Sequence, residues 1–102
     1  MISNKILNPN INDKMLNQKS FTIKDFAVIV QKDMRTIRSW EDKGICDKPP
    51  KNNRNWREYS PIMLAHCLEQ VIDYDWKRRT ITNMKEIRYI IDRLKNKKEN
   101  EK

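Results

Sequence analysis

A mainly α-helical domain with one small β-hairpin is predicted by the order of patterns along this 102-residue sequence. Four segments repeat apolar residues at the spacing of a helix face. Between the second and third of them, residues 46–59 contain a Pro-Pro pair and the run NNRN, which exclude a helix and favour a turn. Two short helices, a hairpin and two packing helices make up a winged helix-turn-helix, and the length fits a single domain.

The ends of the chain are predicted to lie outside the packed domain. Residues 1–20 are polar and rich in asparagine, and Pro9 interrupts them. This composition predicts a flexible arm, which can include a short helix from Ile11 to Leu16. Residues 96–102 form a charged tail. The winged helix-turn-helix domain is therefore expected to span residues 21–95.

The first two helices are predicted from their caps and their apolar faces. Thr22 can cap a helix over residues 22–30. Asp33 can cap the second helix, and Gly44, the only glycine in the chain, can take the left-handed conformation that ends it. The buried stripe of the second helix is expected to consist of Met34, Ile37 and Trp40, which recur every three residues.

Two longer helices are predicted in the C-terminal half. The third starts at Ser60-Pro61, with serine as the cap and proline at the first helical position, where its missing N–H costs nothing. We expect this helix to run to about Trp76. The fourth starts at Asn83, with Glu86 three residues later as its capping-box partner.

The charge balance narrows the choice of partner. The chain has 22 lysines and arginines against 14 acidic residues, a net charge of +8 and a pI near 9.7. A basic balance of this size favours a polyanion, nucleic acid before membrane, although a solvated charged surface is the alternative. No apolar run approaches the ~20 residues that span a bilayer, and no signal peptide opens the chain, so we expect a cytoplasmic protein.

Few residues are available for catalysis or metal binding. Cys46 and Cys67 do not make a disulfide framework, and one histidine, His66, leaves too few ligands for a zinc site. The acidic residues are scattered and no glycine-rich phosphate loop is present. The sequence therefore predicts no enzyme, no cofactor and no metal, with His66 as a helix-surface or packing residue.

The second helix carries the main candidate site. Burial of its apolar stripe turns Arg35 and Arg38 outward, with Thr36 and Ser39 beside them. The major groove of B-DNA admits one helix, and arginine can bind guanine O6 and N7 or grip phosphates. The alternative is a solvated helix face on which Arg38 pairs with an acidic neighbour, Glu41 or Asp42.

The predicted hairpin, or wing, supplies a second group of candidates: Lys51, Asn53, Arg54, Asn55 and Arg57. Arg54 at the tip is the first choice for the narrow minor groove of A·T-rich DNA, which attracts arginine. For Arg57 the competing interpretation is a structural pair with Glu58 or an acidic residue of the third helix. Trp56 and Tyr59 are expected to pack the wing onto the domain, and the alternative is that they stack on bases.

A basic corner follows the third helix. Lys77, Arg78 and Arg79 could hold the DNA backbone there, and a plain exposed turn is the alternative.

Several stretches of the chain resemble the DNA-binding domain of MerR-type regulators, over about residues 21–95. They are FTIKDFA at 21–27, RTIRSWE at 35–41, Gly44-Ile45 and REYS at 57–60. The resemblance implies that Arg35, Thr36 and Arg38 face the DNA and that the basic residues of the wing touch its backbone.

Three positions depart from the pattern of that family. Gln31 stands where the family has a turn glycine, so the turn between the two short helices is expected to be built differently. Lys32 replaces a small apolar residue and is expected to add a phosphate contact. Ser39 replaces the first aromatic residue of the recognition helix.

The predicted function is sequence-specific binding of double-stranded DNA. MerR-type regulators continue into a dimerising helix and an effector-binding region, and this sequence does not. We therefore expect an accessory factor at a plasmid or mobile-element site, serving conjugative transfer, excision or partition. The alternatives are a stand-alone MerR-like transcription regulator and a protein-interaction module such as an antirepressor. Expected partners are A·T-rich DNA with repeated sites, a second copy of the chain and proteins of a nucleoprotein complex.

Overall fold

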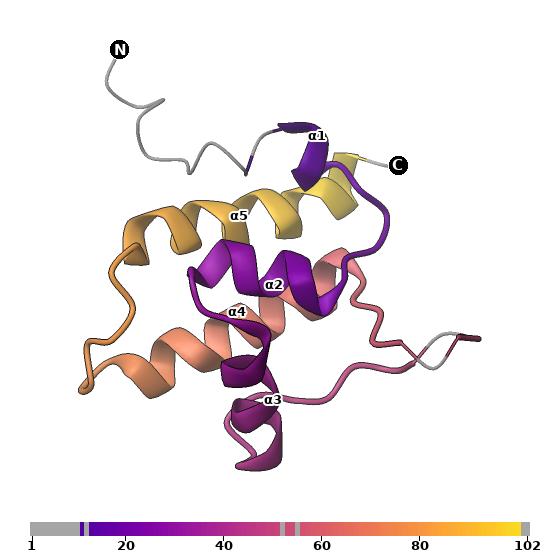
Figure 1. Ribbon diagram of the computed structural model, residues 1–102. Coiled ribbons are helices and arrows are strands. Elements are labelled where there is room, and N and C mark those ends of the chain that lie inside the picture. Colours follow the sequence, from indigo (N-terminus) through magenta and orange to yellow (C-terminus); the bar gives the residue numbers. More distant parts are fainter. Residues whose placement is uncertain (1–10, 12, 52, 55, 101–102) are drawn as a thin grey trace.

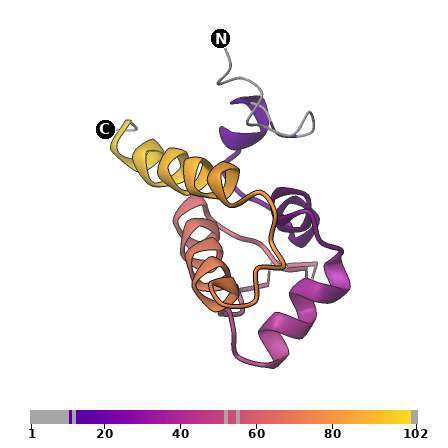
Figure 2. The ribbon, with the colours of Figure 1, turned by 90° about the vertical axis from the view of Figure 1, so that its left-hand side faces the viewer.

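The computed structural model describes residues 11, 13–51, 53, 54 and 56–100 (Figure 1). Within them the chain forms five helices: α1 Asp13–Leu16, α2 Ile23–Val30, α3 Met34–Asp42, α4 Pro61–Asp75 and α5 Met84–Asn100. Helices α4 and α5 run antiparallel, and α2 and α3 lie together on one side of that pair (Figure 2). The prediction of a mainly helical domain is confirmed. No helix in this part of the chain is both long and apolar enough to cross a membrane.

One hydrophobic core joins these helices. Phe26 of α2 stands at its centre, edge-on to Tyr59 with ring centroids 5.5 Å apart and tilted toward Trp40 at 6.2 Å. Leu64 and Leu68 of α4 and the apolar face of α5 complete the core, and all of these α4 and α5 side chains are buried. The core therefore depends on residues from both halves of the chain.

The packed core begins well before residue 21. Ile11 and Leu16 are both buried in it, and Met15 packs against it. Helix α1 lies against α5, as Figure 1 shows. The short helix that the sequence allowed from Ile11 to Leu16 is present as Asp13–Leu16. Residues 1–10 and 12 of the expected arm lie outside the described residues.

The turn between α2 and α3 contains a non-glycine residue in the left-handed conformation. Gln31 has φ 60° and ψ 41°. Its N–H donates to the carbonyl of Val28 at 3.3 Å, and Lys32 N–H donates to that of Ala27 at 3.1 Å. These two bonds form the Schellman arrangement that usually has glycine at the left-handed position. The chain thus forms the turn that usually requires glycine, with glutamine at the left-handed position.

A buried carboxylate organises the corner between α4 and α5. Asp75 accepts hydrogen bonds from Thr80 N–H at 3.0 Å, from the Thr80 hydroxyl and from Ile81 N–H at 2.9 Å. Lys32 Nζ donates to the Thr80 carbonyl at 2.7 Å. Burial raises the pKa of Asp75, but these hydrogen bonds and the charge of Lys32 lower it below its usual value. The corner is therefore tied to the turn between α2 and α3.

A second contact ties the start of α5 to the end of α2. The side-chain amide of Asn83 donates to the carbonyl of Ile29 at 2.8 Å and to Glu86 Oε1 at 2.6 Å. The expected partners Asn83 and Glu86 thus meet through their side chains, and the same amide holds α5 against α2.

The predicted β-hairpin over residues 46–59, hereafter the wing loop, is not confirmed. Its described residues contain no strand, and single antiparallel bridges pair Lys51 with Arg57 and Tyr59 with Phe21. Pro49 and Pro50 carry no N–H, so a ladder cannot continue past Lys51 on that side. Tyr59 instead exchanges two 2.8 Å backbone hydrogen bonds with Phe21, just before α2.

Replacement of Gln31 by glycine should stabilise the domain. Because a left-handed residue with a Cβ costs about 1 kcal/mol, Gln31→Gly is expected to raise the free energy of unfolding by roughly that amount, measured by urea denaturation. Lys43→Gly is the control, since Lys43 ends α3 with φ −87° and gains nothing from glycine. An equal change in both variants would contradict the assigned strain.

Removal of the Asp75 charge should weaken the corner in a pH-dependent way. The pKa of Asp75 in the folded state lies below its usual value of 3.8. Its contribution to stability is therefore present above that usual value and is lost as the pH falls through the folded pKa. Asp75→Asn is expected to cost about 1–3 kcal/mol at pH 7 and less as the solution is acidified. Thermal unfolding of both proteins from pH 7 to pH 3 measures the difference, and a constant gap would oppose this account.

Candidate nucleic-acid interface

Helix α3 begins and ends at local caps, as the sequence predicts. Asp33 Oδ1 accepts from Thr36 N–H at 3.0 Å and from the Thr36 hydroxyl at 2.8 Å. These two hydrogen bonds lower the pKa of Asp33. At the other end Gly44 has φ 77°, and Ile45 N–H returns to the carbonyl of Trp40 at 2.8 Å. The Thr36 hydroxyl thus donates its proton to the capping carboxylate of Asp33. Thr36, one of the residues expected to contact DNA, is therefore also part of the helix cap.

The inner face of α3 differs from the expected stripe in one member. Ile37 and Trp40 are buried as predicted, whereas Met34 is exposed. Glu41, four residues after Ile37, occupies the inner face instead and is buried. Met34 lies in the first turn of the helix, and the contacts with the core are made in the turns that follow.

The outer face of α3 carries the predicted cations. Arg35 and Arg38 are exposed, and Ser39 beside them is half-buried. Within the described part of the chain neither arginine forms an ion pair, so the alternative in which Arg38 pairs with Glu41 or Asp42 is not observed. Both guanidinium groups are therefore available to an anion.

Glu41 instead binds the wing loop. Its carboxylate accepts from Arg57 Nε at 2.8 and 3.0 Å and forms an ion pair with an Arg57 Nη nitrogen at 2.7 Å. The Tyr59 hydroxyl donates to the same carboxylate at 3.3 Å. A single buried carboxylate on α3 thus holds two residues of the C-terminal arm of the wing loop.

The electrostatics of this cluster keep it intact. The hydrogen bonds to Glu41 raise the pKa of Arg57, and burial together with the negative charge of Glu41 raises that of Tyr59. Arg57 therefore stays charged and Tyr59 stays protonated. Sequence reasoning offered Glu58 or the third helix as the partner of Arg57, and the structure places Glu41 there. Arg57 mainly links α3 to the wing loop, because its charge is matched by Glu41.

The tip of the wing loop is exposed and basic. Lys51, Asn53 and Arg54 are exposed, and Asn55 lies outside the described residues. The Arg54 guanidinium lies 5.8 Å from the centre of the Trp56 ring. Tyr59 is buried as expected, but Trp56 is 60% exposed, so the expectation that it packs against the domain is wrong.

Lys32 and the basic corner have different roles. Lys32 was expected to contact phosphate, but its ammonium group donates to the Thr80 carbonyl and is half-buried. Lys77, Arg78 and Arg79 are all exposed, as the expected backbone contacts require. The Arg78 guanidinium stacks over the Tyr74 ring at 4.5 Å. Lys32 therefore positions this corner beside the start of α3.

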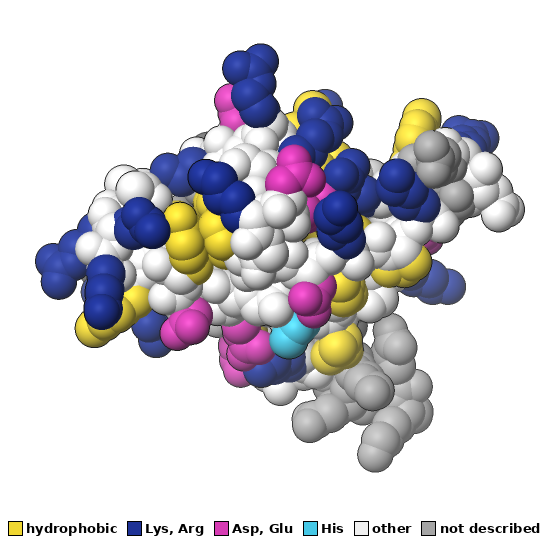
Figure 3. Space-filling view, turned by 90° about the horizontal axis from the view of Figure 1, so that it is seen from below, with side chains coloured by type: hydrophobic (Ala, Val, Ile, Leu, Met, Phe, Trp, Pro, Cys, Tyr) yellow, Lys and Arg dark blue, Asp and Glu magenta, His cyan; other side chains and the backbone are white. Residues whose placement is uncertain are grey.

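Basic side chains are the more numerous charged groups over much of the face that includes α3. In Figure 3, Lys and Arg side chains are spread over the upper half and the left-hand end of the view, while a group of Asp and Glu side chains surrounds the histidine in the lower middle. In that acidic part, His66 Nε2 lies 3.2 Å from Asp47 Oδ2. The basic part of this face, with α3 and the wing loop, is the candidate interface.

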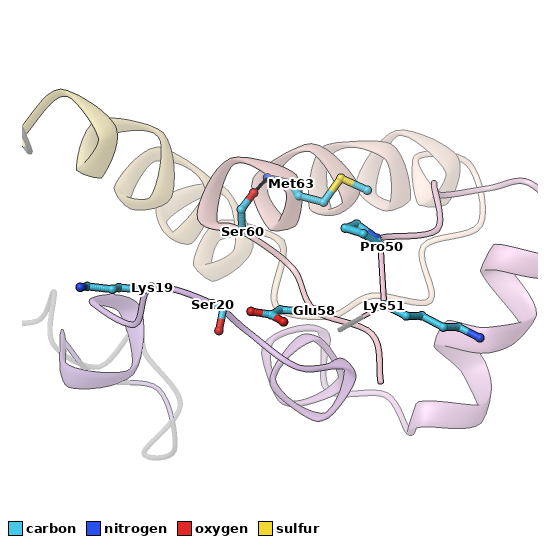
Figure 4. Close-up of a pocket in the computed structure, with 7 residues that line it drawn as sticks. All are labelled: Lys19, Ser20, Pro50, Lys51, Glu58, Ser60 and Met63. Atoms are coloured by element: carbon cyan, nitrogen blue, oxygen red, sulfur yellow. Dashed lines mark hydrogen bonds between the residues drawn. The ribbon is translucent and has the colours of Figure 1, made fainter. Parts of the chain in front are cut away.

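The lysine side chains around one further hollow are not directed into it. A hollow of about 420 Å³ beside the start of α4 is lined by Lys19, Lys51 and Glu58, among others. In Figure 4 the two lysine side chains extend away from it in opposite directions. Among the described residues no three side chains of the metal-binding types come together, and Cys46 and Cys67 are buried free cysteines.

Residues 21–66 match the family model described as MerR HTH family regulatory protein. These residues are a MerR-like helix-turn-helix domain. The resemblance predicted from the sequence is thus confirmed for α2, α3, the wing loop and the start of α4. Comparisons with curated proteins and with solved structures give no match.

The Glu41–Arg57 pair is expected to contribute strongly to stability. Glu41→Ala leaves a partly buried guanidinium without its partner and should cost about 2–4 kcal/mol, less than for a fully buried pair because Arg57 keeps some contact with water. In a double-mutant cycle with Arg57→Ala, a coupling energy of about 1–2 kcal/mol is expected from urea denaturation. Arg38→Ala on the outer face of the same helix is the control and should change stability by no more than ~0.5 kcal/mol. Additive effects of the first two substitutions would refute the assigned pair.

Proposed function

We propose that this protein binds double-stranded DNA in a sequence-specific manner, with α3 in the major groove and the wing loop against the adjoining backbone or minor groove. The observation that carries this proposal is the exposed Arg35–Arg38 face of α3, which has no ion-pair partner among the described residues. Its inner face is held by core packing and by Glu41. A helix anchored in this way within a MerR-like domain can present arginine to base edges and phosphates.

The wing loop and the corner extend the proposed contact on either side of α3. Arg54 is the cation placed at the wing tip, and its stacking on Trp56 keeps it near an exposed surface. Lys77, Arg78 and Arg79 add positive charge beside the start of α3. Narrow A·T-rich minor grooves concentrate negative potential, so we expect A·T-rich sequence at the wing end of the site.

For the process served, we propose an accessory role at a plasmid or mobile-element site, in transfer, excision or partition. Helix α5 supports this role, because its apolar residues Ile87, Ile90 and Leu94 are fully buried inside the domain and are not presented to a second subunit. A stand-alone transcription regulator is the second candidate, and the description of the matching family as regulatory proteins favours it.

Substitutions on α3 should reduce specific binding more than non-specific binding. Sites are first selected from random and plasmid duplexes at two salt concentrations. Arg35→Ala or Arg38→Ala is then expected to lower affinity for the selected site by about 1–3 kcal/mol, roughly 10- to 100-fold, with a smaller loss on random DNA. Lys51→Ala should weaken both about equally and reduce the salt slope by ~1.

Arg88→Ala is the matched control, because Arg88 is an exposed arginine on α5, which lies on the opposite side of the molecule from α3 (Figure 1). It should leave the selection of sites unchanged. Equal losses for Arg35→Ala and Arg88→Ala would remove α3 as the reading helix. The position of the selected site, beside a promoter or at a transfer or attachment site, decides between the two roles.

A further inference from the structure

Two tryptophans of this small domain are exposed at its surface. Trp56 in the wing loop is 60% exposed and Trp76 after α4 is 66% exposed, whereas Trp40 is 8% exposed. A large aromatic side chain at the surface is a typical anchor of a binding site, because it combines a large apolar area with little conformational freedom. The surroundings of the two exposed indoles are different.

Trp56 of the wing loop and Arg38 of α3 both line an open groove. Phe21–Lys24, at the start of α2, also line it, together with Arg57 and Glu58. The groove thus runs between the helix and the wing loop that are proposed to contact DNA. It has a volume of about 530 Å³.

Trp56 is held in place by its neighbours. Arg57, next to it in the chain, is bound to the carboxylate of Glu41 on α3. The backbone of Lys51 forms an antiparallel bridge with that of Arg57 across the wing loop. The Arg54 guanidinium lies 5.8 Å from the centre of the indole ring. The Glu41–Arg57 link therefore holds the backbone next to Trp56 close to α3.

The charges along the groove favour an anionic chain. Lys24 and Arg38 are exposed cations on its helix side, and the charge of Arg57 is matched by Glu41. Glu58 is the acidic residue in the lining, and its backbone N–H is bound to the Pro50 carbonyl. Two exposed cations therefore face an apolar ring across an open groove, which suits an occupant that alternates phosphate groups with less polar rings.

We propose that this groove receives the sugar–phosphate backbone of one DNA strand, with a phosphate beside Lys24 and a deoxyribose packed against the Trp56 indole, while Arg38 on α3 extends to the base edges. This inference rests on the proposed function, because it assumes that α3 and the wing loop bind duplex DNA. It makes Trp56 a contact residue that contributes affinity without contributing charge.

Trp76 supplies a matched control within the same chain. It is as exposed as Trp56, but the hollow beside it is lined by Glu69 and Asp73 as well as Arg88. Glu69 is paired with Lys95, and the carboxylate of Asp73 disfavours a phosphate chain at that position. Trp76 is therefore expected to stay exposed in the complex with DNA.

The first test is acrylamide quenching of tryptophan fluorescence with and without a selected duplex. The Trp76→Phe variant keeps Trp56 as its exposed tryptophan, and the duplex is expected to protect it from the quencher. The Trp56→Phe variant keeps Trp76, and the duplex should leave its quenching unchanged. The buried Trp40 contributes equally to the fluorescence of both variants. Protection confined to the Trp56→Phe variant, or absent from both, would overturn the proposal.

The second test is the salt dependence of affinity. Trp56→Ala is expected to lower duplex affinity by about 10- to 100-fold, because the variant loses a large apolar side chain that the DNA would bury in the complex. The salt slope should stay unchanged, because no charge is lost. Trp76→Ala should bind as the wild type does. If Arg35→Ala loses binding while Trp56→Ala keeps it, only the groove assignment fails. If the wild-type protein selects no duplex, the proposed function fails and this inference falls with it.

Discussion

The buried carboxylate of Glu41 is the interaction on which the geometry of this domain depends. It lies on the inner face of α3 and holds both the guanidinium group of Arg57 and the hydroxyl of Tyr59. Breaking a buried ion pair is costly because it leaves a charge without a partner. One acidic side chain therefore fixes Arg57 and Tyr59 of the wing loop against α3, across the turn after the helix and the Pro-Pro pair of the loop.

A second carboxylate plays a similar part at the other end of α3. Asp75 holds the corner after α4 through Thr80 and Ile81, and Lys32 joins that corner to the turn before α3. Both carboxylates are buried, and neither forms an ion pair with Arg35 or Arg38 on the outer face of α3.

Most of the fold was predictable, whereas the contacts that individual loop residues make were not. The starts of α2, α3 and α4 were found from their caps Thr22, Asp33 and Ser60, all three of which accept the expected hydrogen bond. The hydrogen bond from Lys32 to Thr80 was not foreseen, and the expected packing of Trp56 was wrong. A charged or aromatic residue in a loop carries no local signal of what it will touch, since its partner comes from a distant segment.

By itself, the sequence determined the helices of this protein and the outward face of α3. A cap bonds to an amide three residues away, and a helix face repeats every three to four residues. Both can therefore be predicted from residues that are close together in the sequence. Tertiary structure alone decided which charges are available to a partner. Glu41 meets Arg57 16 residues later, and Lys32 meets Thr80 48 residues later. Such pairs form only when packing of the core brings distant segments together, and only then is it settled which cations remain exposed.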